Sequence, residues 1–318
     1  MGKKVKNELI RHELGVVEAE GIVLLDAVED FDGDQRLIHL FFRNDADTLL
    51  VFPGDGLKVR ETTTISNAPW WICEAAEAEG PVEMTFGSTK VKITPSQNDQ
   101  ALYAGKNCFV AVRNGDSAKT VIDWLNYHCA HHDLQGAVIL DRSEPGSDKG
   151  FMRKLRKWMK DMQHPCTVTL LNANTPLGNL DSPPEAHPYC APDAPGKDRM
   201  EIPEGDGWAA PLTQVLVYEL IRKRYLGAAR AVANLDVYDL IVEDERGSIF
   251  DAAVECEAGA IPLAWRHVYP WRTRKNQGAL FGDHICVQFD ARKLKQRWCI
   301  APAKATDTAI WRLIRIGN

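Results

Sequence analysis

Polar side chains gather where three apolar stretches of the sequence end. They are Arg113 and Asn114 after CFVAV, Asp141 and Ser143 after GAVIL, and the carboxylates Asp236 and Asp239 late in ARAVANLDVYDLIV. If these stretches are parallel β-strands, their carboxyl ends meet at one edge of a sheet, where open α/β folds bind ligands. An arginine, two polar loops and a carboxylate pair would then line one crevice and bind a charged ligand.

Each of these residues also has a simpler interpretation. Carboxylates at strand ends often cap a turn, and this applies to Asp141, Asp236 and Asp239. A strand-end arginine such as Arg113 commonly forms a surface ion pair, although it could also neutralise a diphosphate. The residue types and their spacing leave both interpretations open.

The elements that would position these residues alternate between strand and helix. Apolar runs at 108–112, 136–141 and 166–173 read as buried strands, and the stretches at 117–133 and 151–162 between them have helical periodicity. Strand, helix, strand, helix, strand is typical of a parallel, doubly wound sheet. The sequence therefore predicts an α/β fold for this part of the chain.

The regions on either side have a different character. Short apolar or alternating runs separated by turn residues at 16–103 predict a small β-sandwich or barrel. Residues 174–210 are rich in Pro, Gly, Asp and Glu and predict a long loop, either a lid or an insertion. A helix at 211–226 and a strand at 229–242 follow. We expect a β-rich domain at 1–104 and an α/β domain at 105–318.

Composition and charge narrow the classes of partner. The chain of 318 residues is 45% hydrophobic and 26% charged, with a net charge of −6, so it lacks the basic footprint of nucleic-acid binding. No apolar run reaches the length of a transmembrane helix. The eight cysteines include no C-x-x-C pair and read as free thiols. We expect a cytoplasmic protein without nucleic-acid partners, with peripheral membrane association left open.

Three histidines share one face of the helix predicted at 117–133. His128, His131 and His132 have a spacing that can hold a metal ion. No second group with ligand spacing completes such a site. Packing of His128 against Trp124 and Tyr127 is therefore the favoured interpretation.

The stretch at 112–148, together with later residues, resembles the family 92 and related family 2 glycosyltransferases with a GT-A fold. The shared features are a strand ending in a polar turn, a helix with an acid-W-x-x-Y-H pattern, a strand ending in Asp, a helix with a Gln and a strand ending in a carboxylate motif. The residues that carry them are Arg113, Asn114, Asp123, Trp124, Tyr127, His128, Asp141, Ser143, Gln214 and the run from Leu235 to Leu240.

The resemblance, which covers about residues 107–315, implies a GT-A-like, three-layer domain with a mixed sheet after the β-rich domain. It implies transfer of a sugar from a nucleotide-sugar donor to a glycan or lipid-linked acceptor, as in polysaccharide biosynthesis. It also implies the following site residues. The donor would be bound by Arg113, Asn114, Asp141, Ser143 and Gln214, and a divalent cation, Mn²⁺ or Mg²⁺, by Asp236 and Asp239.

The sequence departs from the family at two of these positions. The glutamate of the first turn is Gly115, and the second carboxylate of the metal motif is Tyr238. A site with one carboxylate fewer binds a divalent cation more weakly. The alternative prediction is therefore a non-catalytic, degenerate glycosyltransferase-like domain that acts as a binding or scaffolding module.

Overall fold

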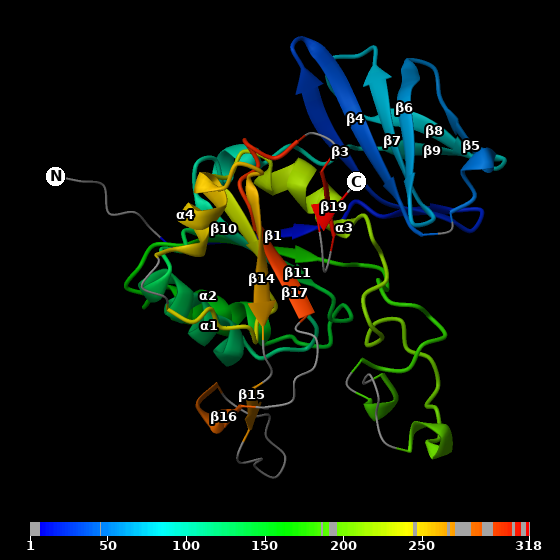
Figure 1. The fold of residues 1–318 in the computed structure, drawn as a ribbon. Helices are drawn as coiled ribbons and strands as arrows, with labels where there is room; N and C mark the ends of the chain where they lie inside the picture. The colour runs from blue at the N-terminus through cyan, green and yellow to red at the C-terminus, as the bar shows by residue number, and fades with distance from the viewer. Residues whose placement is uncertain are drawn as a thin grey trace.

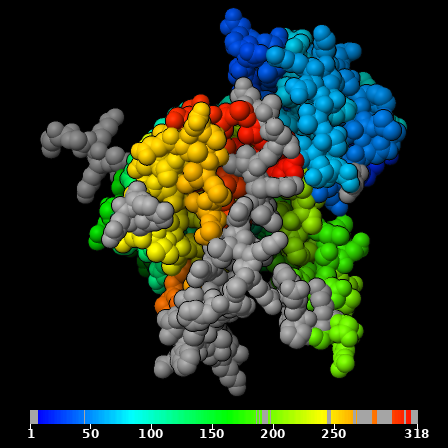
Figure 2. Space-filling view, in the orientation of Figure 1, coloured from blue at the N-terminus to red at the C-terminus, as the bar shows by residue number. Residues whose placement is uncertain are grey.

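The protein is described by a computed structural model. The structure describes residues 7–44, 46–185, 187–190, 196–243, 247–265, 268–270, 281–287, 295–306, 309–312 and 316–317. The fold is α/β, with a mixed sheet and separate antiparallel sheets. Figure 1 shows the small antiparallel sheets beside the larger, mixed sheet and its helices, and Figure 2 shows them as a lobe on that larger body.

The larger sheet has the order β1-β12-β11-β10-β13-β17-β14. All pairings from β1 to β13 are parallel, whereas β17 runs antiparallel to both of its neighbours. Its strands are β1 (Glu8–Glu13), β10 (Asn107–Arg113), β11 (Gly136–Asp141), β12 (Thr167–Asn172), β13 (Ala231–Asn234), β14 (Ala260–Trp265) and β17 (Lys295–Ile300). The mixed sheet and the predicted strand–helix alternation are therefore present.

Both faces of the larger sheet are covered, so its central strands are buried almost throughout. One face packs against α1 (Ala118–His131), α2 (Phe151–Met159) and α4 (Ile249–Glu255). The other face packs against α3 (Val217–Ile221) and the π-helical turn η5 (Arg222–Leu226). These layers leave the two ends of the strands as the places where a ligand can approach the sheet.

Residues 17–93 form two antiparallel sheets around a shared apolar core. The first has the order β2-β3-β4-β7-β6 and the second β5-β8-β9. Their strands are β2 (Val17–Ala19), β3 (Ile22–Asp32), β4 (Gln35–Phe42), β5 (Val51–Pro53), β6 (Leu57–Ile65), β7 (Ala68–Ala75), β8 (Val82–Phe86) and β9 (Thr89–Ile93). Short hairpins elsewhere pair β15 (Val268–Pro270) with β16 (His284–Val287), and β18 (Ile310–Trp311) with β19 (Ile316–Gly317).

The topology modifies the division expected at residue 104. Strand β1 pairs in parallel with β12, so the N-terminal strand is an edge of the larger sheet and not part of the small lobe. Buried side chains of β3 and β4, among them Leu25 and Phe41, also belong to the same apolar core as α3. Independent folding of residues 1–104 and 105–318 stays a prediction, but the hydrogen-bonded strands do not separate there.

Helix α1 shows how the local sequence builds the larger domain. The Ser117 side chain accepts a hydrogen bond from the backbone N–H of Thr120 at 3.1 Å, which caps the first turn. Val121, Leu125 and Cys129 repeat at helical spacing and are buried against the sheet. The helix thereby fixes the loop between β10 and α1, which carries part of the candidate site.

His128 of α1 is a buried, neutral histidine with both ring nitrogens engaged. Nε2 accepts from the backbone N–H of Ile241 at 3.2 Å, so Nδ1 carries the proton and donates to the Trp124 carbonyl at 2.9 Å. Burial lowers the pKa of His128 to about 3. The ring packs edge-on against Trp124 and Tyr127, with centroids 5.4 and 5.0 Å apart, as the packing interpretation expects.

We expect the stability of the protein to fall in mild acid because of His128. A histidine whose pKa drops on folding contributes stability above its unfolded pKa of 6.5, and that stability is lost as pH falls from 6.5 toward 3. Between pH 6.5 and pH 5 the loss is about 2 kcal/mol, at about 1.4 kcal/mol per pH unit. Urea unfolding at pH 7 and pH 5 measures it, and His128→Gln should show a smaller decrease than the wild type. Lys119, exposed on the same helix, provides the control as Lys119→Met, which should keep the wild-type decrease.

Candidate functional site

The three strand ends singled out in the sequence lie at the same edge of the larger sheet, as predicted. Strands β10, β11 and β13 are neighbours and parallel. Arg113 pairs in register with Asp141, and Val110 with Asn234, so Asp236 follows β13 at the level of Val112. The carboxyl edge therefore brings an arginine and carboxylates from separate parts of the chain together.

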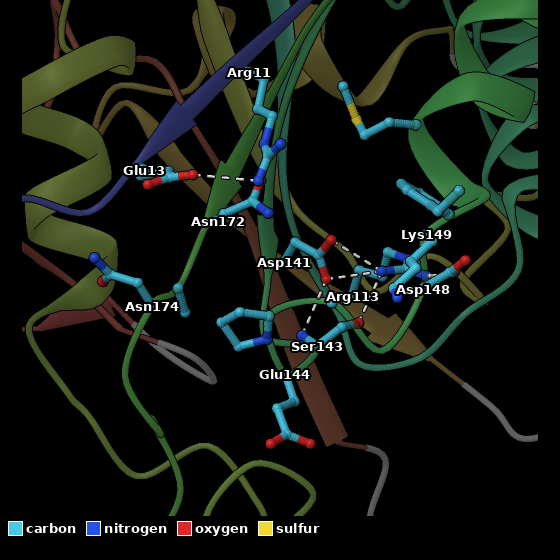
Figure 3. A pocket seen from close by; sticks show the side chains of 15 residues that line it. Arg11, Glu13, Arg113, Asp141, Ser143, Glu144, Asp148, Lys149, Asn172 and Asn174 are labelled. Atoms are coloured by element: carbon cyan, nitrogen blue, oxygen red, sulfur yellow. Dashed lines mark hydrogen bonds and ion pairs between the residues drawn. The ribbon is translucent and has the colours of Figure 1, made fainter.

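A cavity of about 330 Å³ lies at this edge, beside the ends of β1, β11 and β12 (Figure 3). Most of the described residues that line it are polar or charged, and apolar atoms also contribute to its wall. The lining residues include Arg11, Glu13, Arg113, Asp141, Ser143, Glu144, Asp148, Lys149, Met152, Asn172 and Asn174. Among the described residues that line the cavity, Asp236 and Asp239 do not appear, so they lie along the same edge but outside this hollow.

Arg113 is the centre of the polar network at this edge. It is fully buried, and Nη1 donates to both carboxylate oxygens of Asp141 at 2.8 and 2.9 Å and to Ser143 Oγ at 2.8 Å. Nη2 donates to Asp148 at 2.6 Å, and Nε donates to the backbone carbonyl of Asp116 at 2.7 Å. The guanidinium also stacks 3.5 Å from the centre of the Phe151 ring.

These contacts exclude the interpretation of Arg113 as a surface ion-pair residue. Every nitrogen of its guanidinium donates to a protein oxygen, so the group forms a buried ion-pair network and not a surface ion pair. Its contribution to a ligand site is therefore to hold Asp141, Ser143 and Asp148 in place around the cavity, as Figure 3 shows.

The loop between β10 and α1 is also held by hydrogen bonds from its backbone. Asn114 donates its backbone N–H to Asp116 at 3.1 Å, and Gly115 donates its own to Ser143 Oγ at 3.2 Å. Gly115 has φ of +82°, a left-handed conformation that strains any side chain. A glutamate, which the resemblance would place at this position, would be strained in this conformation.

The carboxylate pair after β13 already has a cationic partner. Arg297 of β17 forms a hydrogen bond with Asp236 through Nη2, and its Nε lies 3.6 Å from Asp239 Oδ2. Asp239 also accepts the backbone N–H of Asp236 at 2.9 Å. Asp239 therefore caps the turn after β13, and Arg297 lies beside the two carboxylates to which the resemblance assigns a divalent cation.

Tyr238, which stands between Asp236 and Asp239 in the sequence, forms a hydrogen bond with Asp116. Burial raises the pKa of Asp116, while a hydrogen bond from Tyr238 lowers it. The same interaction occupies the tyrosine hydroxyl, and burial raises the Tyr238 pKa. Tyr238 therefore links the turns after β10 and β13 as a neutral hydrogen-bond donor, and it supplies no anionic oxygen for a cation.

Gln214 lies apart from the other predicted donor-binding residues. Its side-chain oxygen accepts the backbone N–H of Asn44 at 2.9 Å, and Asn44 donates in turn to the Thr213 carbonyl at 2.7 Å. These bonds connect the segment before α3 to the small lobe. Gln214 is buried and does not line the cavity.

Several residues of the site were not predicted from the sequence. Asn172 could have been found, since it ends the strand β12 in the same way that Asp141 ends β11. Asp148 and Arg297 carry no local signal, because their partners come from other elements. Arg11 and Glu13 reach the cavity only because β1 pairs with β12.

Comparison with models of known protein families gives no match, and comparison with curated protein sequences gives none either. None of the described helices has the length and hydropathy needed to cross a membrane. The argument for function therefore depends on the geometry of the carboxyl edge.

Proposed function

We propose that the chain is a glycosyltransferase with a GT-A-like domain, which moves a sugar from a nucleotide-sugar donor to a glycan or lipid-linked acceptor in the cytoplasm. The observation that carries the proposal is the polar cavity at the carboxyl edge, with Asp141 in its wall and Asp236 two strands away along the same edge. The mixed sheet between two covering layers also supports it.

The cavity suits the nucleoside part of such a donor. Asp141, Ser143 and Asn172 offer oxygen atoms that accept hydrogen bonds from a base or a ribose, and they come from two adjacent strand ends. The Asn172 side-chain oxygen is buried and has no hydrogen-bond partner among the described residues. A buried acceptor of this kind gains free energy when a ligand donor reaches it.

The diphosphate would lie toward Asp236, where charge must be neutralised as the sugar leaves. The resemblance implies a divalent cation there, and the donor set does not fit one. Arg297 is paired with Asp236 and Asp239, Asp239 caps a turn, and Tyr238 binds Asp116. Since a hard cation needs several free oxygen ligands, we derive no step through a metal.

A binding experiment tests the donor site. Calorimetry with uridine and guanosine diphosphates should show binding of at least one of them, and Asn172→Ala should weaken it about 3- to 10-fold, the usual effect of one neutral hydrogen bond. Asp123→Asn, on the exposed face of α1, is the matched control and should bind as the wild type does. If neither nucleotide binds, the proposal is wrong.

The alternative, a non-catalytic binding module, is supported by the contacts of Arg297 with Asp236 and Asp239. These contacts neutralise the two carboxylates that the resemblance assigns to a metal. Hydrolysis of nucleotide sugars, followed as release of the nucleoside diphosphate, separates the two functions. Release that depends on Asn172 supports the enzyme. Donor binding without release, in the presence of a panel of glycan acceptors, would support the binding module.

A further inference from the structure

One row of side chains crosses the carboxyl edge of the larger sheet on the side of α2. Glu13 pairs in register with Asn172, Asn172 with Asp141, and Asp141 with Arg113. Residues in register on parallel strands project to the same face of a sheet. Ile139, two residues before Asp141, packs with α1 and α2, so the row faces those helices. All four side chains line the cavity, as Figure 3 shows.

The two middle residues of the row present unused hydrogen-bond acceptors to the cavity. Asn172 Oδ1 is buried and has no partner among the described residues. Asp141 Oδ1 accepts from Arg113 at 2.8 Å and from the Ser143 backbone N–H at 3.1 Å. In the described part of the chain Asp141 Oδ2 accepts only from Arg113, at 2.9 Å, so one of its two lone pairs is left. Neighbouring strands lie about 4.8 Å apart, so the two acceptors stand side by side.

Ser143 adds a hydrogen-bond donor beside Asp141. Its Oγ accepts from Arg113 at 2.8 Å and from the Gly115 backbone N–H at 3.2 Å. Its own hydroxyl hydrogen has no acceptor among the residues that the structure describes, so a ligand can receive it. From β12 toward β10, the cavity wall therefore offers two adjacent acceptors, on Asn172 and Asp141, followed by a donor on Ser143.

The charged groups of the cavity also favour a ligand that brings N–H donors. Every nitrogen of Arg113 already donates to a protein oxygen, and Arg11 is paired with Glu13 at 3.2 Å. Carboxylates outnumber cations among the described lining residues, which include Glu13, Asp141, Glu144 and Asp148 against Arg11, Arg113 and Lys149. A phosphate would meet net repulsion in this hollow, whereas the N–H groups of a base would meet acceptors.

Among the common nucleobases, guanine complements this order of groups. Its pairing edge has two adjacent donors, the 2-amino group and N1–H, followed by the O6 acceptor. Uracil has a single N–H between two carbonyls, so one carbonyl would face the Asn172 or Asp141 oxygen. Cytosine and adenine have one amino group beside an unprotonated ring nitrogen, which would face an acceptor in the same way. Pro145 and Met152, which also line the cavity, offer apolar contact to the faces of the ring.

We infer that the cavity recognises guanine, so that the donor is a guanosine diphosphate sugar. Asn172 accepts from the 2-amino group, Asp141 accepts from N1–H, and the Ser143 hydroxyl donates to O6. The inference rests on the proposed function and names the base of its donor. Bases with other patterns are rejected because they leave buried acceptors unpaired.

The test compares guanosine, inosine and uridine diphosphates by calorimetry on the whole chain. The base of inosine keeps N1–H and O6 and lacks only the 2-amino group. We expect guanosine diphosphate to bind about 3- to 10-fold more tightly than inosine diphosphate, the usual effect of one neutral hydrogen bond. Uridine diphosphate should bind about 10- to 100-fold more weakly than guanosine diphosphate, because it leaves a buried acceptor unpaired.

The variant Asn172→Ala should abolish the preference for guanosine over inosine diphosphate, since only guanosine loses a hydrogen bond. The ratio of the two affinities is measured on one protein sample, so it does not depend on the fraction of the variant that is folded. Asn179→Ala is the matched control, because Asn179 is exposed on the loop after β12 and does not line the cavity. It should keep the wild-type ratio.

Equal affinities for guanosine and inosine diphosphates, or tighter binding of uridine diphosphate, overturn the inference and leave the proposed function standing. A guanosine preference that persists in Asn172→Ala also overturns it. A guanosine preference that is lost in Asn172→Ala, without release of the diphosphate from guanosine diphosphate sugars, supports guanine recognition and refutes the transferase. Absence of binding by all three nucleotides refutes both.

Discussion

Replacing Arg113 with methionine should lower the free energy of unfolding by about 3–5 kcal/mol, the usual cost of removing one partner of a buried ion pair. The substitution leaves the Asp141 carboxylate buried without its bidentate partner and removes the bonds to Ser143 and Asp148. Urea unfolding at pH 7 measures the change. The cavity wall should loosen at the same time, so nucleotide binding should be lost in the folded variant.

Two further variants make the Arg113 prediction specific. Lys119→Met removes an exposed i,i+4 ion pair with Asp123 and should cost only about 0.5 kcal/mol. Arg113→Met combined with Asp141→Leu removes the stranded carboxylate and should recover part of the stability without recovering nucleotide binding. Equal losses in Arg113→Met and Lys119→Met would contradict the central role of Arg113.

Replacing Arg224 with methionine should cost a similar 3–5 kcal/mol and should act on the contact between the lobes. Arg224 of η5 donates to Asp26 of β3 at 2.8 Å and to the Glu13 carbonyl at 3.1 Å. Both side chains are buried, so the pair joins the larger domain to the small β-sheets. Hydrogen exchange should show faster exchange in β2 and β3 of the variant than in the wild type.

The pH dependence of the Arg224→Met variant provides a second measurement. Burial raises the pKa of Asp26, and the charge of Arg224 opposes that effect. Without Arg224 the pKa rises further, and a raised pKa in the folded state means that stability is gained as pH falls through it. The difference in the free energy of unfolding between the wild type and the variant should therefore become smaller from pH 7 to pH 4. Arg60→Met, which removes an exposed pair with Asp32, should show no such change.

The sequence predicted the parts of the fold that have a local pattern. Buried strands such as β10 and β11 are continuous apolar runs, and α1 carries a capping serine and helical spacing, so each can be read within about fifteen residues. The helix expected over 211–226 begins only at Val217, and after Ile221 it continues to Leu226 as a π-helical turn. The start of this helix is set by the packing of its residues against the larger sheet, which no local pattern shows.

Strand β1 and the partners of the site residues could not be predicted in the same way. ELIRHE is short and charged, and it becomes a strand only because β12 offers it an edge. Strand ends indicated Asp141 and Asp236 as neighbours along one edge, but Arg297 comes from a strand whose direction no local pattern determines. Whether a carboxylate binds a metal or an arginine depends on such distant partners.

The pairing of β1 with β12 also affects the order in which the chain can fold during its synthesis. Glu8 pairs with Thr167, so the first strand must wait until 159 further residues have been made. At about 5–20 residues per second this interval is roughly 8–30 s. Residues 17–93 pair among themselves and can fold meanwhile, which would tether β1 close to the growing sheet. The small lobe thus precedes the edge strand in assembly, although it follows it in the chain.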